Sequence, residues 1–181
     1  MIFTETKLKG AYLIEPEPFQ DERGIFARIY CKKEFQQIGH QKEFVQSNVS
    51  VNHNLYTFRG LHYQLPPFSE IKLVRCHKGR VHDIIVDLRK GSETFLQHYS
   101  IELTGKNMKM LYIPEGFAHG FLTLEDDSQM TYLHTAYYQP GFEGGLRFDD
   151  PALNIELPEE PALISEKDMN HAFIKPHYKG I

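Results

Sequence analysis

The sequence predicts a mainly β domain, an antiparallel sandwich or barrel, and three observations favour this fold class. Short apolar runs follow one another, separated by polar or glycine-containing turns about every 8–12 residues. Within VHDIIVDL (81–88), apolar residues alternate with Asp83 and Asp87 over most of the run, which is the period of a half-buried strand. Tyr and Phe, which suit β-structure, supply all of the 13% aromatic content because Trp is absent.

Six strands are expected in the middle of the chain, and each is delimited by its turns. The segment KGR separates the first strand from the second, RKGS the second from the third, and TGKN the third from the fourth. The residues EG and EDDS separate the last three strands. Closing such strands into a sandwich or barrel removes exposed edges that would pair with other chains. The expected strands cover residues 71–77, 81–88, 94–103, 108–114, 117–124 and 129–138.

Helix is expected in only two short segments. The segment KKEFQQIG (32–39) is compatible with one helix that Gly39 ends. The segment PALISEKDMNHAF (161–173) is the second candidate, with Ser165 as the N-cap and Asp168 three residues later.

Composition indicates an ordinary soluble protein. With 41% hydrophobic and 24% charged residues and no internal repeat or linker, residues 1–181 are expected to form a single domain. A net charge of −4 without a basic block argues against nucleic acid or a membrane as partner. The chain has no signal-peptide pattern and no apolar run near the ~18 residues of a membrane span, so a cytoplasmic location is expected. Cys31 and Cys76 lack zinc-type spacing and are predicted to be free thiols.

The ten histidines raise the question of a metal centre. A jelly-roll metal site typically supplies an HxH pair with a carboxylate and a later histidine. The residue two positions after His62 is Gln64, and no HxH pair occurs. The segment IPEGFAHGF (113–121) resembles only the later half of a cupin metal motif, which offers too few ligands. We therefore predict no metal.

Other common chemistries find no support. The chain has no GxSxG, GxGxxG or P-loop pattern, and the Gly-rich segment GFEGGLRF is expected to be a loop. A set of side chains suited to proton transfer remains within or near the predicted β-structure. Each alone also has a structural explanation, such as a hydrogen-bonded core histidine, a buried tyrosine or a helix cap. The set consists of His62, Lys72, His119, Tyr132, Tyr138 and Asp168.

Five motifs together carry a resemblance to one family. They are RGLHYQ, KLVR followed by VDLRKGS, IPEGFAHGF, YYQPGFEGGLRFDDPAL and ISEKD, in this order. From about Gly10 to about Asp168 the chain resembles the dTDP-4-dehydrorhamnose 3,5-epimerases. The resemblance implies a cupin-type double-stranded β-helix, or jelly roll, with a few short helices near the termini. It also implies a homodimer with strand exchange, and neither a metal nor an organic cofactor.

The implied reaction explains the residue types. The substrates of the family are nucleotide-linked 4-keto-6-deoxyhexoses, whose ketone makes the hydrogens on C3 and C5 acidic. Inversion then needs a base, a donor for the enolate oxygen, and an acid on the opposite face. The resemblance assigns these roles to His62 as base with Asp168 as its orienting partner, Lys72 at the enolate, and Tyr132 as acid, flanked by Arg59 and His119.

Substrate-binding residues carry over as well. Arg23 and Phe26 match residues that reach the nucleotide from the partner subunit, and four further positions match other contacts: Gln46, Asn48, Tyr138 and Glu143. Three positions depart from the family pattern and bear on which base and sugar are bound. They are Arg28 where Glu is usual, Asn52 where Ser is usual, and His134 where a small polar residue is common.

The expected function is therefore an isomerase that converts dTDP-4-dehydro-6-deoxy-D-glucose to dTDP-4-dehydro-L-rhamnose. An epimerase restricted to C3 or to C5, or one using a CDP- or GDP-linked sugar, is the nearest alternative. A non-catalytic cupin that binds sugar nucleotides would not need the acid and base together. A metal-dependent cupin oxygenase is disfavoured by the missing HxH pair.

Overall fold

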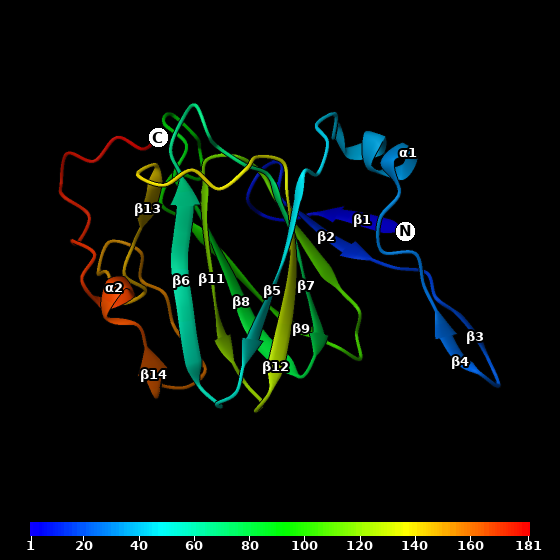
Figure 1. Ribbon diagram of the computed structural model, residues 1–181. Coiled ribbons are helices and arrows are strands. Elements are labelled where there is room, and N and C mark those ends of the chain that lie inside the picture. Colours follow the sequence, from blue (N-terminus) through cyan, green and yellow to red (C-terminus); the bar gives the residue numbers. More distant parts are fainter.

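The computed structural model describes residues 1–181 and contains two six-stranded sheets and a separate hairpin (Figure 1). The first sheet has the order β1 (Ile2–Glu5), β2 (Tyr12–Glu15), β10 (Met110–Ile113), β7 (Lys72–Lys78), β12 (Ser128–His134) and β5 (Gln46–Asn52). The second has the order β13 (Glu143–Gly145), β6 (Thr57–Gln64), β11 (Phe117–Thr123), β8 (Arg80–Asp87) and β9 (His98–Thr104), with β14 (Leu163–Ile164) also paired to β6. The hairpin consists of β3 (Phe19–Asp21) and β4 (Gly24–Phe26).

Successive strands alternate between the two sheets from β5 to β8 and again from β9 to β12. The strand pairs are antiparallel, except that β14 runs parallel to β6. This is the arrangement of a jelly roll, and it confirms the predicted mainly β fold.

A core of buried apolar side chains joins the two sheets. Val74 and Leu111 of the first sheet share one cluster with Ile85 and Phe121 of the second. A further cluster lies on the other face of the second sheet, since Ile84 precedes Ile85 on β8 and belongs to it. The segment after β13 covers that face of the second sheet. Its contributing side chains are Leu146, Leu153, Ile155, Ile164, Tyr178 and Ile181. Both cysteines are free, as predicted.

Strand β8 differs from its prediction because it is buried on both faces. Asp83 and Asp87, expected to face solvent, are fully buried. Each of these buried carboxylates has at least one hydrogen-bond partner, although Oδ1 of Asp83 has none. Oδ2 of Asp83 lies 2.8 Å from Nε2 of His119. Asp87 accepts from the guanidinium of Arg89 and from the Ser92 and Thr94 hydroxyls.

The six predicted strands correspond to β7–β12, with two corrections at their ends. The strand expected over 94–103 begins only at His98, because Thr94 turns back to bind Asp87 and Leu96 has a positive φ of 61°. The strand expected over 129–138 ends at His134, after which the backbone N–H of Tyr138 donates to the side chain of Gln46.

The segment GFEGGLRF, expected to be a loop, contains β13, which pairs with β6 beside His62. Two glycines permit this close approach. A Cβ on Gly144 would collide with the ring of Tyr63, and one on Gly145 would collide with the imidazole of His171. The pairing of β13 with β6 depends on contacts between segments far apart in the sequence, so the residue pattern of GFEGGLRF alone does not indicate a strand.

The helices are short, as predicted. Helix α1 (Lys32–Phe35) continues as a 3₁₀ turn and ends at Gly39, whose φ of 76° is left-handed. Helix α2 (Glu166–Met169) is much shorter than the expected 161–173 because β14 occupies residues 163–164. Its predicted cap is confirmed, since Ser165 Oγ accepts a hydrogen bond from the Asp168 N–H at 3.1 Å. The helices of the structure lack the length and apolar character of a membrane-spanning segment.

Candidate active site

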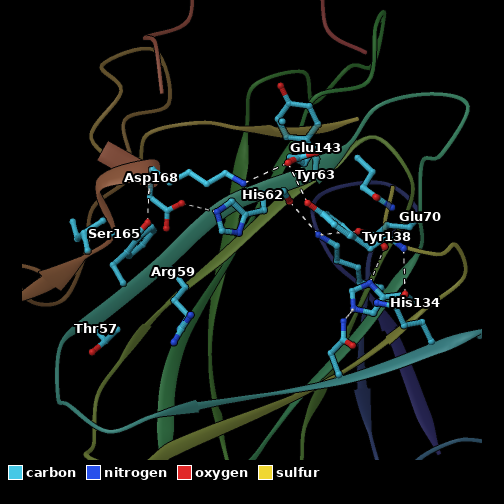
Figure 2. A pocket seen from close by; sticks show the side chains of 18 of the residues that line it. Thr57, Arg59, His62, Tyr63, Glu70, His134, Tyr138, Glu143, Ser165 and Asp168 are labelled. Atoms are coloured by element: carbon cyan, nitrogen blue, oxygen red, sulfur yellow. Dashed lines mark hydrogen bonds and ion pairs between the residues drawn. The ribbon is translucent and has the colours of Figure 1, made fainter. Parts of the chain in front are cut away.

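Side chains from both sheets line a cavity of about 710 Å³ (Figure 2). Strands β5, β7 and β12 supply residues on one side, β6 on the other, and β13, β14 and α2 complete the lining. A side cavity of about 280 Å³ extends to His119 and Tyr132. Both cavities belong to one site because they share lining residues, namely Asn48, Arg59, His62, Lys72 and His134.

His62 and Asp168 form a hydrogen-bonded pair at this site. The Nε2 atom of His62 lies 2.7 Å from Oδ1 of Asp168; the His62 side chain is 46% exposed and that of Asp168 only 5%. Burial alone would raise the pKa of Asp168, but the hydrogen bond from His62 and the nearby His62 charge lower it below its ordinary value. An anionic Asp168 accepts the Nε2 proton, which leaves Nδ1 of His62 as the basic nitrogen.

His171 is a site residue that the sequence reasoning missed. It follows Asp168 by three residues, and donor atoms of His62, Asp168 and His171 all lie within 4.8 Å of one another. These three side chains are the ones that could hold a metal ion, although the sequence predicts none. Burial lowers the pKa of His171, as does the neighbouring charge of His62. The buried Nε2 of His171 has no hydrogen-bond partner.

Lys72 begins β7 and points its ammonium at the backbone of β6. Its Nζ donates to the carbonyl oxygen of His62 at 3.1 Å and lies 3.4 Å from Oε1 of Glu70. Burial lowers the pKa of Lys72, and the Glu70 carboxylate opposes this shift. Glu70 was not predicted, because it precedes both the expected strand (71–77) and β7, so no strand pattern indicated that its side chain meets Lys72.

Tyr132 and His119 meet in the side cavity. The two rings are 6.0 Å apart at an interplanar angle of 73°. Burial raises the pKa of Tyr132, and the nearby carboxylate of Asp83 raises it further. The phenol therefore keeps its proton at neutral pH. His119 is nearly fully buried, and Asp83 holds its imidazole beside the Tyr132 ring in an edge-to-face contact.

Arg59 lies on β6 between the two cavities. Its Nε donates to Oδ1 of Asn52 at 2.6 Å. Asn52 is itself buried, and its amide nitrogen donates to the carbonyl oxygen of Ser128 at 2.9 Å. Asn52 therefore acts on the site by orienting the Arg59 guanidinium, which leaves the remaining N–H groups of Arg59 available to a ligand.

Four predicted substrate contacts line the main cavity together: Gln46, Asn48, Tyr138 and Glu143. The hydroxyl of Tyr138 donates to Glu143 at 3.1 Å, and the backbone N–H of Tyr138 donates to Gln46 at 3.2 Å. These bonds tie the segment after β12 to β5 and β13, so they shape the mouth of the cavity.

The hairpin residues do not reach this cavity within one chain. Arg23 and Phe26 lie on β3–β4, which projects away from the two sheets (Figure 1). Arg23 pairs with Asp21 on the surface. Arg28 pairs with Glu34 at 2.7 Å and does not line the cavity either.

This arrangement is suited to moving protons beside a carbonyl group. A carboxylate-bound imidazole offers a base, a buried ammonium and a guanidinium offer positive charge, and a protonated phenol offers an acid. These groups come from different strands and surround one cavity, so a ligand can meet base and acid on different sides.

Comparisons with known proteins agree with this chemistry. The family model of dTDP-4-dehydrorhamnose 3,5-epimerase matches residues 5–175. The dTDP-4-dehydrorhamnose 3,5-epimerase of Shigella flexneri is 41% identical over 167 residues, which cover 92% of this chain and 92% of that protein. The crystal structure of dTDP-4-dehydrorhamnose 3,5-epimerase from Bacillus anthracis with TDP and PPi bound aligns with a TM-score of 0.92 and 38% identity, over 96% of this chain and 99% of that one. The dTDP-6-deoxy-D-glucose-3,5-epimerase of Legionella pneumophila in complex with dTDP-4-keto-L-rhamnose aligns with a TM-score of 0.90 and 36% identity, over 95% and 92% of the respective chains.

Proposed function

The chain belongs to the dTDP-4-dehydrorhamnose 3,5-epimerase family, and on that premise we propose that it converts dTDP-4-dehydro-6-deoxy-D-glucose to dTDP-4-dehydro-L-rhamnose. The protein is an isomerase that acts on a nucleotide-linked 4-keto sugar. One observation supports the assignment of roles: the His62–Asp168 pair, Lys72 and Tyr132 surround a single site.

His62 is the general base in this proposal. Its Nδ1 takes the proton from C3 or C5, the C–H electron pair forms a double bond to C4, and the carbonyl oxygen becomes an enolate. Lys72 donates a hydrogen bond to that oxygen, and Arg59 adds positive charge. Tyr132 then gives its proton to the same carbon from the opposite face, and the C4 ketone re-forms. Proton exchange with solvent restores neutral His62 and protonated Tyr132.

The protonation states support these roles. The lowered pKa of Asp168 keeps it anionic, so it stabilises the imidazolium that forms when His62 takes a proton. The raised pKa of Tyr132 keeps the acid protonated before transfer. The ketone of the substrate acidifies the reacting hydrogens, so the residues of the chain suffice for every step.

The nucleotide end of the substrate is assigned to the mouth of the cavity, where Gln46, Tyr138 and Glu143 lie. We place Arg23 and Phe26 of a second copy beside it, in a homodimer. The exposed apolar surface of the hairpin supports this, because Phe19 is 64% exposed, Ile25 57% and Phe26 78%. Such a patch is the kind of surface that a partner covers.

The direct test is NMR of the dTDP-linked 4-keto-6-deoxyglucose with this protein in D₂O. We expect deuterium at both C3 and C5 and formation of the L-rhamnose configuration. Deuterium at one carbon alone would reveal a single-site epimerase. Tight binding without any exchange would overturn the proposal and indicate a non-catalytic binding protein.

The same reaction is run with EDTA, because His62, Asp168 and His171 could hold a metal ion. We expect unchanged turnover. Loss of turnover that a divalent ion restores would contradict the predicted metal-free mechanism.

A further inference from the structure

A second imidazole–carboxylate pair lies in the cavity, apart from His62 and Asp168. The Nδ1 atom of His134 is 2.8 Å from Oε2 of Glu70. Both side chains are largely buried, with 11% of His134 and 9% of Glu70 exposed. The register of the first sheet places His134 directly opposite Lys72, since β12 and β7 pair these two residues. Figure 2 shows His134 beside Glu70, and Oε1 of Glu70 lies 3.4 Å from the ammonium of Lys72.

The hydrogen bonds form one chain across β5, β12 and β7. The Asn48 amide nitrogen lies 3.4 Å from Nε2 of His134. An amide nitrogen only donates, so Nε2 accepts and Nδ1 carries the proton that His134 donates to Glu70. Glu70 then has its other oxygen, Oε1, left for Lys72 at 3.4 Å. Each carboxylate oxygen has one partner, and the pKa of Glu70 is lowered despite burial because His134 and Lys72 stabilise the anion.

The hydrogen-bond partners of the Lys72 ammonium can be counted in the same way, because it has three N–H groups. One donates to the carbonyl oxygen of His62, and one faces Glu70. The third remains for the cavity that Lys72 lines. The direction of this third N–H depends on Glu70, because the other partner of Lys72 is a backbone carbonyl and Glu70 is the side chain that orients the ammonium.

We propose that His134 and Glu70 are positioning residues: His134 fixes the Glu70 carboxylate, and Glu70 holds the Lys72 ammonium at the substrate oxygen where negative charge develops. This inference rests on the proposed function, which assigns Lys72 to that oxygen. His134 also stacks on Tyr132, with ring centroids 6.0 Å apart and an interplanar angle of 18°. His134 therefore contacts both Tyr132, the proposed acid, and Glu70, which holds Lys72.

Two substitutions of His134 separate positioning from packing. His134→Leu removes the donor to Glu70, whereas His134→Asn places an amide nitrogen where Nδ1 was. We expect His134→Leu to lower kcat about tenfold or more with little change in KM, because the contact strengthens only as charge develops on the oxygen. His134→Asn should recover most of the loss. The control is His53→Leu, which breaks an exposed pair with Asp127 outside the cavity and should leave kcat unchanged.

A second readout does not require turnover. NMR titration of the Lys72 side chain in the free protein follows its pKa, which burial already lowers. Glu70→Gln removes the nearest opposing charge, so the midpoint should move to lower pH, and the alkaline limb of the kcat profile should move with it. The other titratable groups around Lys72 stay the same in that variant: His62, Asp83, Tyr132 and His134.

The outcomes separate the two proposals. A wild-type protein without epimerase activity would overturn the proposed function. An active wild type, with normal kcat in His134→Leu and an unmoved Lys72 titration in Glu70→Gln, would overturn the positioning role. If His134→Leu does not fold, kcat of Glu70→Gln and the Lys72 titration decide the question alone.

Discussion

The hydrogen bond between Nε2 of His62 and Asp168 leaves Nδ1 as the nitrogen of the imidazole that can take a proton. At the level of single residues, each group to which we assign a role in the proposed mechanism has neighbours that influence its protonation state. Lys72 has Glu70 as its counter-charge, and Tyr132 lies among buried groups that keep its proton on the oxygen. The partners set protonation in advance of substrate binding, which is why single substitutions should separate the steps of the reaction.

The division of labour between base and acid is testable in D₂O. His62→Ala should abolish both deuterium exchange and epimerisation, with a loss of at least about 10²–10⁴-fold, typical of a positioned base. Tyr132→Phe keeps the ring and removes the hydroxyl. It should still form the enolate and incorporate deuterium with the original configuration, while inverted product falls sharply. Normal inversion in Tyr132→Phe would remove Tyr132 from the role of acid, and complete loss of exchange would place it at the abstraction step.

The lowered pKa of Asp168 predicts a pH-dependent contribution to stability. A carboxyl group with a lowered folded-state pKa stabilises the protein fully above its unfolded pKa of about 3.9, and this stabilisation is lost as pH falls through the folded value. The difference in Tm between wild type and Asp168→Asn should therefore be large at pH 7 and shrink in acid. Thermal unfolding across this range measures it, with Asp127→Asn, an exposed carboxylate, as control. A difference that does not vary with pH would argue against an ionised Asp168.

At the scale of elements, β6 holds the site because short segments far along the chain pack against it. β13 and β14 pair with β6 on the same sheet, and the short helix α2 brings Asp168 to His62. The cap of α2 is a single side chain, Ser165, whose Oγ accepts from the N–H of Asp168 itself. The position of the Asp168 carboxylate is thus coupled to a helix cap.

Loss of this cap should affect both stability and catalysis. Ser165→Ala should cost about 0.5–2 kcal/mol of unfolding free energy, the usual range for an N-cap. It should also lower kcat, since the Asp168 backbone loses its anchor. Ser165→Thr retains an acceptor and should behave like wild type in denaturant unfolding and in turnover. Equal losses in both variants would mean that the size of the side chain matters and the cap does not.

At the level of the whole molecule, the hairpin β3–β4 belongs to neither six-stranded sheet and exposes apolar side chains (Figure 1). A homodimer in which Arg23 completes the partner's site can be tested by mixing two variants of low activity. Arg23→Ala and His62→Ala should each be weak alone. Their heterodimer has one site with intact His62 from one chain and intact Arg23 from the other, so mixing under exchange should restore activity. If Arg23 acts within its own chain, mixing restores nothing.

Features that depend on near neighbours along the chain could be predicted from the amino-acid sequence. The strand and turn pattern from 71 to 138 predicted β7–β12, Gly39 predicted the end of the first helix, and Ser165 predicted the cap of the last. The motifs around His62 and Asp168 predicted the family. These signals are local because a turn, a cap or a motif is set by residues a few positions apart.

Contacts between side chains far apart in the sequence became visible in the folded chain and were not predicted. The tertiary structure buried Asp83 against His119, turned the expected loop around Gly145 into a strand, and brought His171 to the His62–Asp168 pair. It also joined Glu70 to His134, which are 64 residues apart. The pairing register of β12 with β7 places His134 across from Lys72, and no local pattern encodes that register. The physical reason is that these contacts arise from packing two sheets around one core, which orders side chains whose separation in sequence carries no periodic signal.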